Sequence, residues 1–280
     1  MGNICWLASY PKSGNTWIRA FLANYFSNQS TPVDINALHE LSQSEASAFR
    51  YQHHVEGGDT TALDAEAICA IRPLVQAEMA QQAHGTAFVK THNFLGEYKG
   101  YPLHNSAVTS AAVYVLRNPL DVAISVANYF ALTLDEAIDF MAEEMTGTPS
   151  EEHNVPQIIS SWSNHVQSWT GQADPSILVL KYEDLLDKPQ KAFRKVVSHL
   201  GQPRDDKRLK RAIQFCSFAQ MKQQERKGGF VERHENARSF FRSGRKNQWL
   251  QTLSDEQVAR LVEDHREQME RFGYLPPKFR

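Results

Sequence analysis

The first 27 residues combine an apolar run, a polar loop and an amphipathic helix, and this order constrains the fold more than any other feature of the chain. Residues 4–9 (ICWLAS) form a short apolar run that Tyr10 and Pro11 end, as expected for a buried strand. From residue 15 onward, apolar residues recur at the i, i+3/i+4 and i+7 spacing of a helix with one buried face. The segment therefore predicts a strand, a loop and a helix, which is half of a βαβ unit.

The rest of the chain repeats this alternation. Near-continuously apolar runs, typical of parallel strands, predict further strands at residues 86–90, 111–116 and 177–180. Helical spacing predicts helices at residues 64–82, 119–130, 134–144, 156–169, 189–200, 205–215 and 255–272. We expect Pro73 to kink or divide the first of these helices, and residues 28–58 to be irregular. The pattern predicts one α/β domain over residues 1–280, with a central parallel sheet flanked by helices.

The composition argues against several other kinds of protein. The formal charge of −2 gives no overall basic field, so we expect no nucleic-acid partner. The three cysteines are far apart and form no CxxC pair, which predicts neither a disulfide framework nor a zinc site. No apolar run approaches the ~18 residues that a membrane span needs. We therefore expect a cytoplasmic protein with no membrane partner.

The loop at residues 10–17 (YPKSGNTW) has the features of an anion site. A glycine-bearing turn between a buried strand and a helix directs backbone N–H groups and the positive helix end toward a bound anion. The loop also carries one lysine and three short polar side chains. It lacks the GxxxxGK[ST] of ATP- and GTP-binding P-loops, because its lysine precedes the glycine. An ordinary strand-to-helix turn with capping Ser and Asn explains the loop equally well, so both interpretations stay open at this point.

Four further segments carry motifs that belong with this loop. They are residues 90–92 (KTH), 113–125 (VYVLRNPLDVAIS), 178–185 (LVLKYEDL) and 241–244 (FRSG). Together with the loop, in this order, they resemble the sulfotransferases that use PAPS (3′-phosphoadenosine-5′-phosphosulfate), and among these the cytosolic, small-molecule type. The last motif departs from the family's Arg-Lys-Gly by having Ser243 in place of the lysine. The resemblance implies a P-loop nucleotide-kinase-like fold and an enzyme, a PAPS-dependent sulfotransferase.

The resemblance also implies which residues bind the donor nucleotide. The 5′-phosphosulfate would be bound by Lys12, Ser13, Gly14, Asn15 and Thr16. The adenine would pack against Trp17, Tyr182 and Phe218. The 3′-phosphate would be bound by Arg117 and Ser125, and covered by Arg242, Ser243 and Gly244 of a mobile cap loop at residues 222–247. Two alternatives remain, because Trp17 also has the spacing of a core-facing helical residue, and Arg117 could pair with Asp121.

The catalytic groups follow from the same resemblance. His92 would be the general base that takes the acceptor proton, since a neutral imidazole with a pKa near 6.5 suits this task at neutral pH. Lys12 would stabilise the charge that develops on the leaving 5′-phosphate. Lys90, two residues before His92 on the same strand face, would stabilise the transferring group. We expect no metal ion, because no acidic pair resembling a magnesium site accompanies the loop.

The acceptor is expected to be a small molecule with a phenol, alcohol or amine group. We expect residues 28–58, the segment after His92 and residues 141–156 to shape its pocket. A homodimer stays open, because the lysine-led dimer motif of many relatives is not recognisable around residues 248–257. Two other functions also stay open. One is a P-loop-type, ATP-dependent kinase, which would need a lysine after the glycine and a magnesium-holding acid. The other is a non-catalytic nucleotide-binding protein with the same fold.

Overall fold

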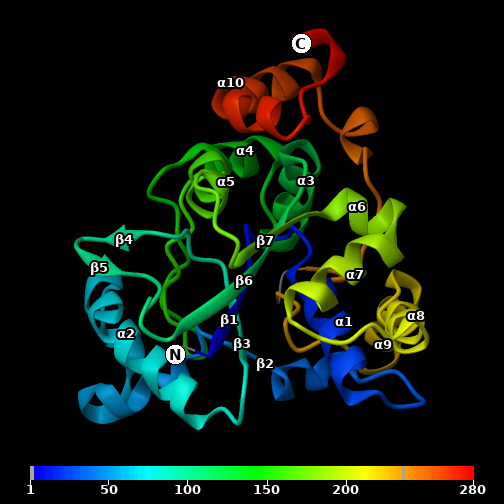
Figure 1. The fold of residues 1–280 in the computed structure, drawn as a ribbon. Helices are drawn as coiled ribbons and strands as arrows, with labels where there is room; N and C mark the ends of the chain where they lie inside the picture. The colour runs from blue at the N-terminus through cyan, green and yellow to red at the C-terminus, as the bar shows by residue number, and fades with distance from the viewer. Residues whose placement is uncertain (1–2, 235–236) are drawn as a thin grey trace.

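Parallel strands form the central sheet, in the order β2-β3-β1-β6-β7 (Figure 1). The structure is a computed structural model and describes residues 3–234 and 237–280; residues 235–236 of the expected cap loop lie outside the described residues, as do residues 1–2. The strands of this sheet are β1 (Ile4–Ser9), β2 (Ser42–Ser44), β3 (Ala87–Thr91), β6 (Thr109–Leu116) and β7 (Ile177–Lys181). A separate antiparallel pair joins β4 (Glu97–Tyr98) and β5 (Tyr101–Pro102).

Helices cover both faces of the central sheet (Figure 1). The α-helices are α1 (Asn15–Ser27), α2 (Ala65–Gln82), α3 (Pro119–Phe130), α4 (Leu134–Ala142), α5 (Trp162–Thr170), α6 (Tyr182–Asp187), α7 (Pro189–His199), α8 (Asp206–Phe215), α9 (Phe218–Gly228) and α10 (Asp255–Arg271). Short 3-10 helices lie at Ile35–Glu40, Ala48–Arg50, Gln52–His54, Glu56–Gly58, Thr60–Ala62, Gln248–Gln251 and Pro277–Phe279.

Side chains along β1 point alternately to the two faces of the sheet, and each face has its own apolar core. Cys5 and Leu7 face one side of the sheet and pack with apolar residues of α1, α7 and α8. Trp6 and Ala8 face the other side and pack with α2, α3, α5 and α10. Because successive strand residues point to opposite faces, an uninterrupted apolar run fits a strand that is covered on both sides. The predicted α/β class, with one parallel sheet between helical layers in a single domain, is confirmed.

The structure differs from the predicted elements in five places. Neither the polar edge strand β2 nor the short helix α6 was predicted. The helix predicted from residue 156 begins only at Trp162, because the side chain of Ser161 caps it by accepting from the N–H of Asn164. The first part of the expected mobile cap loop is helical, since α9 extends to Gly228. Finally, α2 continues through Pro73 as one helix.

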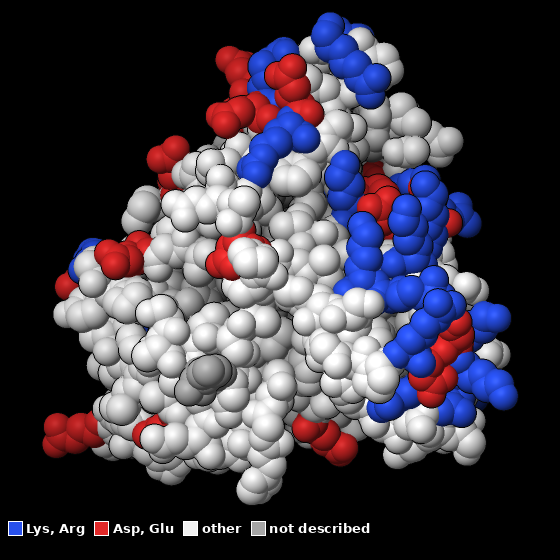
Figure 2. All heavy atoms as spheres, in the orientation of Figure 1, with Lys and Arg blue, Asp and Glu red and all other residues white. Residues whose placement is uncertain are grey.

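The charge is distributed unevenly over the surface. Figure 2 shows that Lys and Arg side chains gather on the side of the molecule formed by α7 and α8. These helices carry Lys191, Arg194, Lys195, Lys207, Arg208, Lys210 and Arg211. The formal charge of −2 is therefore the sum of a face rich in basic residues and a more acidic remainder of the molecule.

Candidate active site

A cavity of about 610 Å³ opens where β1, β3 and β6 end. Its wall includes the loop after β1, the end of β3, residues of α3, the segment at residues 148–159 and the segment at residues 231–244. In α/β proteins, the carboxyl ends of parallel strands are the usual place for ligands. Every predicted site residue lines this cavity except Ser13, which is buried in the loop itself.

The backbone of the loop directs the start of α1 toward the cavity. Gly14 precedes the helix with φ 113°, and no side chain in the described part of the chain caps the first turn. The first N–H groups of a helix have no intrahelical acceptor, so an uncapped helix start can bind an anion. A Cβ at Gly14 would lie 2.9 Å from Cδ2 of Tyr182, which makes glycine necessary for space as well as for backbone conformation.

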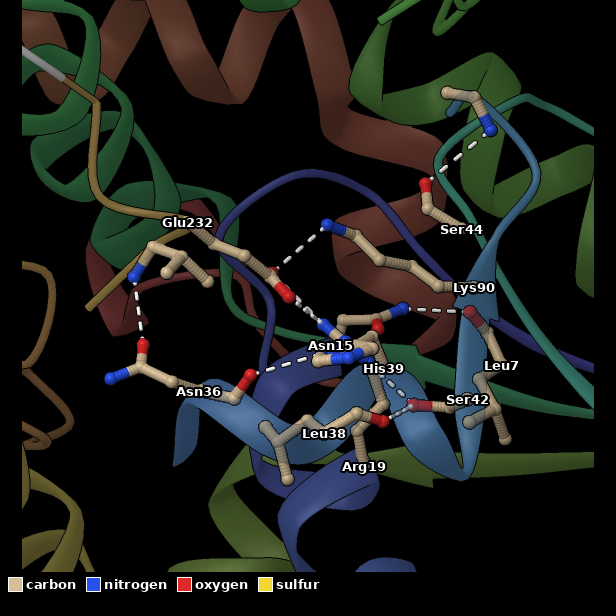
Figure 3. Close-up of polar contacts among 12 residues, drawn as sticks. Leu7, Asn15, Arg19, Asn36, Leu38, His39, Ser42, Ser44, Lys90 and Glu232 are labelled. Carbon is tan, nitrogen blue, oxygen red and sulfur yellow. Dashed lines mark hydrogen bonds and ion pairs between the residues drawn. The ribbon is translucent and has the colours of Figure 1, made fainter. Parts of the chain in front are cut away.

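The short polar side chains of the loop have different surroundings. The Asn15 amide donates to the carbonyl oxygen of Leu7, at 2.7 Å, and so ties the helix start to β1 (Figure 3). Its side chain therefore has a structural partner in addition to any role toward a ligand. The hydroxyl of Ser13 is buried and has no hydrogen-bond partner among the described residues. A buried polar group usually has a partner, so this hydroxyl fits a loop that binds an anion.

Lys12 lies between two aromatic rings at the centre of the cavity. Its ammonium is 3.9 Å from the ring centroid of Tyr129 and 3.8 Å from that of Phe240. Burial, followed by the charges of Lys90 and Arg117, lowers the pKa of Lys12 to about 7. A lysine with such a pKa gains most from an anionic ligand, because the ligand restores the charged form.

A second cationic group lies at the end of β6. The Arg117 guanidinium donates to the carbonyl oxygens of Lys12, at 3.1 Å, and Arg245, at 3.3 Å. It has no ion pair within the described residues, and its Nε is buried without a partner there. The alternative pairing with Asp121 is wrong, because that carboxylate accepts from the N–H groups of Asn247, at 2.7 Å, and Trp249.

Arg242 faces the same position from the other side of the cavity. Its pKa is lowered by burial and then by the charge of Arg117, which places the two guanidinium groups close enough to repel each other. Ser125 of α3 lines the same cavity. Two guanidinium groups that repel each other across a cavity form a favourable site for a phosphate, whose oxygens accept from both.

Aromatic rings also line the cavity. Trp17 contacts Tyr182, with ring centroids 5.6 Å apart, and also contacts Phe193 of the core at 5.9 Å. Trp17 thus lines the cavity and packs against the core at the same time, and its contact with adenine stays a prediction. A Cβ at Gly244 would lie 2.4 Å from the ring of Phe218, so the segment after Arg242 lies directly on that ring.

His92 follows β3 at the cavity wall. Its Nδ1 lies 2.8 Å from the carbonyl oxygen of Ser9, which can only accept, so Nδ1 carries the proton and Nε2 is free to accept one. Burial, followed by the charge of Lys90, lowers the pKa of His92 to about 3. The backbone carbonyl of His92 accepts in turn from Nε2 of His165, at 3.2 Å. The ring is therefore neutral at physiological pH and is held at Nδ1, while the backbone of His92 is held by His165.

The comparisons with known proteins identify the family of this fold and site. Residues 4–273 match the family described as the sulfotransferase domain. The chain belongs to this family. It is 24% identical over 284 residues to the flavonol 3-sulfotransferase of Flaveria bidentis, with 92% of this chain and 79% of the relative covered. It is 27% identical over 279 residues to cytosolic sulfotransferase 14 of Arabidopsis thaliana, with 91% and 72% covered.

Solved structures agree on the fold of this sulfotransferase. Retinol dehydratase in complex with retinol and PAP has a TM-score of 0.66 at 18% identity, covering 96% of this chain and 82% of that one. A mouse sulfotransferase complexed with PAP has a TM-score of 0.62 at 20% identity, covering 95% and 84%. The predicted family and the predicted P-loop-kinase-like fold are therefore confirmed. In the residues described, no helix is long and apolar enough to cross a membrane.

Several cavity residues were not predicted from the sequence. Tyr129, Phe240 and Glu232 surround the lysines, and Glu151 and His153 come from the segment at residues 148–157. Glu232 is the least expected of them, because an acid inside an Arg- and Lys-rich stretch reads as a solvated charge. Of the segments expected to shape the acceptor pocket, residues 141–156 contribute to the cavity wall. Residues 28–58 and those directly after His92 are not among the residues that line it.

Proposed function

We propose that this sulfotransferase transfers the sulfuryl group of PAPS to a hydroxyl or amine group of a small acceptor, with His92 as the general base. The observation that carries the proposal is one cavity that holds two separate cationic groups and a neutral histidine with a free Nε2. PAPS carries an anionic group at each end of its adenosine, so it needs two such groups at a distance. Two of the structurally similar proteins are in complex with PAP, the product nucleotide, which supports this choice of donor.

The donor would lie across the cavity with its ends on the two cationic groups. The 5′-phosphosulfate would bind the start of α1, with Lys12, Ser13, Gly14, Asn15 and Thr16. The adenine would pack between Trp17, Tyr182 and Phe218. The 3′-phosphate would bind Arg117 and Ser125, under Arg242, Ser243 and Gly244 of the cap loop. Arg245 would take no part through its side chain, which is exposed and lies outside the cavity wall.

The transfer itself would be an in-line displacement at sulfur. The acceptor oxygen or nitrogen forms a bond to sulfur, while the bond between sulfur and the 5′-phosphate oxygen breaks and its electrons stay on the phosphate. His92 takes the acceptor proton on Nε2. Lys12 stabilises the charge that develops on the leaving phosphate, and Lys90 stabilises the transferring group. The proposal includes no metal ion.

The acceptor would be a small phenol, alcohol or amine. The names of two relatives, flavonol 3-sulfotransferase and luciferin sulfotransferase, point to small organic acceptors and support this class. The aromatic surface of Tyr129, Phe130 and Phe240 at the cavity wall fits such molecules. We further propose a cytoplasmic enzyme with neither a nucleic-acid nor a membrane partner. The proposal leaves a homodimer open.

Thermal unfolding with two ligands tests the donor. We expect PAP (3′,5′-ADP) to raise the Tm and ATP with Mg²⁺ to leave it unchanged, because a ligand stabilises only the protein that binds it. The reverse result would support an ATP-dependent kinase and overturn the proposal. Incubation with sulfur-labelled PAPS and a panel of phenols, alcohols and amines then tests turnover. Binding of PAP without transfer to any member of a broad panel would favour the non-catalytic nucleotide-binding protein.

A further inference from the structure

The carboxylate of Glu232 lies beside lysine side chains in the part of the cavity lined by Lys12 and Lys90, which is called the transfer end below. Glu232 accepts from Nη1 of Arg19 on α1, at 2.6 and 2.9 Å, and from Nζ of Lys90 on β3, at 3.2 Å. Figure 3 shows its carboxylate between these two side chains. Arg19 and Glu232 are 213 residues apart in the chain, so the bridge forms only when the cap segment lies on the sheet end.

The segment around Glu232 is held by further contacts on both sides. The Tyr129 hydroxyl donates to the backbone oxygen of Glu232, at 3.1 Å. The Asn36 side chain accepts from the N–H of Val231, at 2.9 Å, and donates to the carbonyl oxygen of Gly229, at 3.4 Å. These bonds fix the backbone, and the backbone then directs the carboxylate to Arg19 and Lys90.

Arg19 has a strong requirement for this carboxylate. Its side chain is 2% exposed, and its Nε donates to the hydroxyl of Ser42 at 2.8 Å. A buried guanidinium that loses its carboxylate partner leaves an uncompensated charge in a medium that solvates it poorly. The ion pair therefore favours the docked position of the cap segment, and it keeps Glu232 in its charged form, with a pKa lowered to about 2 by Lys90 and Arg19 against the effect of burial.

The charges around Lys12 give Glu232 a second effect. Lys90 of β3 and Arg117, which follows β6, disfavour the charged form of Lys12, whereas Glu232 and Glu225 favour it. Tyr129 and Phe240 flank the ammonium, and His234 packs on the far side of the Tyr129 ring. The carboxylate of Glu225 accepts from the N–H groups of Phe240 and Phe241, so that acid also belongs to the cap.

We propose that Glu232 is a positioning residue of the anion site: it holds Lys90 at the cavity wall and adds a negative charge beside the lysines, so that the anion site is complete only when the cap segment is docked. The inference rests on the function proposed above, since it assumes that the two lysines receive the anionic part of the donor. The cap segment would then have two roles: Arg242, Ser243 and Gly244 would cover the 3′-phosphate, and Glu232 would position the lysines at the transfer end of the cavity.

The test is the pH dependence of PAP binding to Glu232→Gln, measured by isothermal titration calorimetry at pH 6 and pH 8. The pKa of Lys12 is about 7, so it is charged at pH 6 and mostly neutral at pH 8 before the ligand binds. Removing the carboxylate lowers that pKa further. We expect the loss of affinity between pH 6 and pH 8 to be about threefold greater in Glu232→Gln than in the wild type, which corresponds to a shift of about half a pKa unit.

A matched control and a second variant separate this effect from simple loss of structure. Glu66→Gln removes a carboxylate from the exposed ion pair with Lys99 and should leave the ratio unchanged. Glu232→Asp keeps the charge and should retain most of the wild-type ratio. An unchanged ratio of the PAP affinities at pH 6 and pH 8 in Glu232→Gln would overturn the inference. Tighter binding of PAP to this variant at both pH values would also overturn it, because the carboxylate would then compete with the anionic ligand for the lysines. If the wild type itself does not bind PAP, the proposed donor fails instead.

Discussion

The tautomer of His92 follows from one hydrogen bond. Because Nδ1 donates to the carbonyl oxygen of Ser9, Nε2 keeps its lone pair. Burial holds the pKa near 3, so the ring is neutral throughout the neutral range but is a weaker base than the expected imidazole with a pKa near 6.5. Lys90, two residues earlier, lowers the pKa as well and would disfavour the imidazolium, while the anionic groups of a bound donor would favour it.

Replacement of His92 by Ala tests the general base. We expect kcat for sulfuryl transfer to fall by about 10²- to 10⁴-fold, the usual contribution of general base catalysis. The affinity for PAP should stay close to that of the wild type, because the imidazole contacts none of the groups proposed to bind the nucleotide. Initial rates with an acceptor found by screening measure the first quantity, and calorimetry measures the second.

A control for this variant is His84→Ala, which removes an exposed histidine. Its kcat should equal that of the wild type. Turnover by His92→Ala at the rate of the control would remove His92 from the proposed mechanism. A parallel loss of PAP affinity in His92→Ala would instead indicate that the variant had disturbed the carbonyl oxygen of Ser9 and the loop that follows it.

For single residues, the sequence identified those that lie close to the end of a strand. Arg117 directly follows an apolar run, and His92 and Lys12 lie two and three residues beyond one. All three line one cavity. Glu232 and Tyr129 could not be found in this way. Their places depend on the return of the chain to the sheet end after long separations, and no local pattern around either residue specifies that contact.

Among the elements, the turn into α1 depends on glycine for two separate reasons. Gly14 has φ 113°, and a Cβ there would meet Tyr182. We expect Gly14→Ala to lower the free energy of unfolding by about 1–3 kcal/mol through backbone strain. We also expect a loss of PAP affinity of about tenfold or more, since displacement of Tyr182 disturbs both the adenine pocket and Arg117, whose guanidinium lies 4.5 Å from that ring.

Gly85 provides a matched control for this substitution. Its φ is 101°, but a Cβ there would meet no atom within 4 Å. Gly85→Ala should therefore show the strain in urea unfolding and bind PAP as the wild type does. Equal affinity for PAP in the two variants would contradict a role of the Gly14–Tyr182 contact in nucleotide binding.

Helices and strands, like single residues, could be predicted where the local sequence determines them and not where distant contacts do. The strands that lie between two helical layers are apolar throughout, so β1, β3, β6 and β7 were predictable. The edge strand β2 has the sequence SQS and pairs only with β3, so neither hydrophobicity nor length distinguishes it from a loop. The α9 helix escaped prediction because its polar composition resembles that of a mobile segment, whereas Ser217 caps it and Glu225 ties it to the cap.

At the scale of the whole molecule, buried histidines couple folding to pH. Burial lowers the pKa of His104 and His165 to about 3 and that of His265 to about 4. His104 and His165 lie in one aromatic cluster with Trp6, Trp169 and Tyr114, whereas His265 lies on α10. Each stays neutral in the folded protein under conditions that protonate it in the unfolded chain.

This difference makes stability fall as the pH is lowered below the unfolded pKa of about 6.5. Between that pH and about 4, the unfolded state binds more protons than the folded state, because the pKa of His92 is also lowered to about 3. The free energy of unfolding therefore decreases by up to about 1.4 kcal/mol per pH unit for each histidine, or about 5 kcal/mol per pH unit for these three and His92 together. Typical domains are stable by only about 5–15 kcal/mol, so we expect cooperative acid unfolding between about pH 5 and pH 4. Urea unfolding curves from pH 7.5 to pH 5 measure the slope.

His265→Gln distinguishes this cause from general acid sensitivity. The substitution removes one of the four buried imidazoles and keeps a polar group near Ser163, whose hydroxyl lies 3.0 Å from Nδ1. The slope of unfolding free energy against pH below 6 should therefore fall by about a quarter relative to the wild type, even if the variant is less stable at pH 7.5. His84→Gln, at the surface, should keep the full slope. A wild-type slope in His265→Gln would mean that this histidine takes up its proton in the folded state, and that α10 moves away from α5 before the rest of the molecule unfolds.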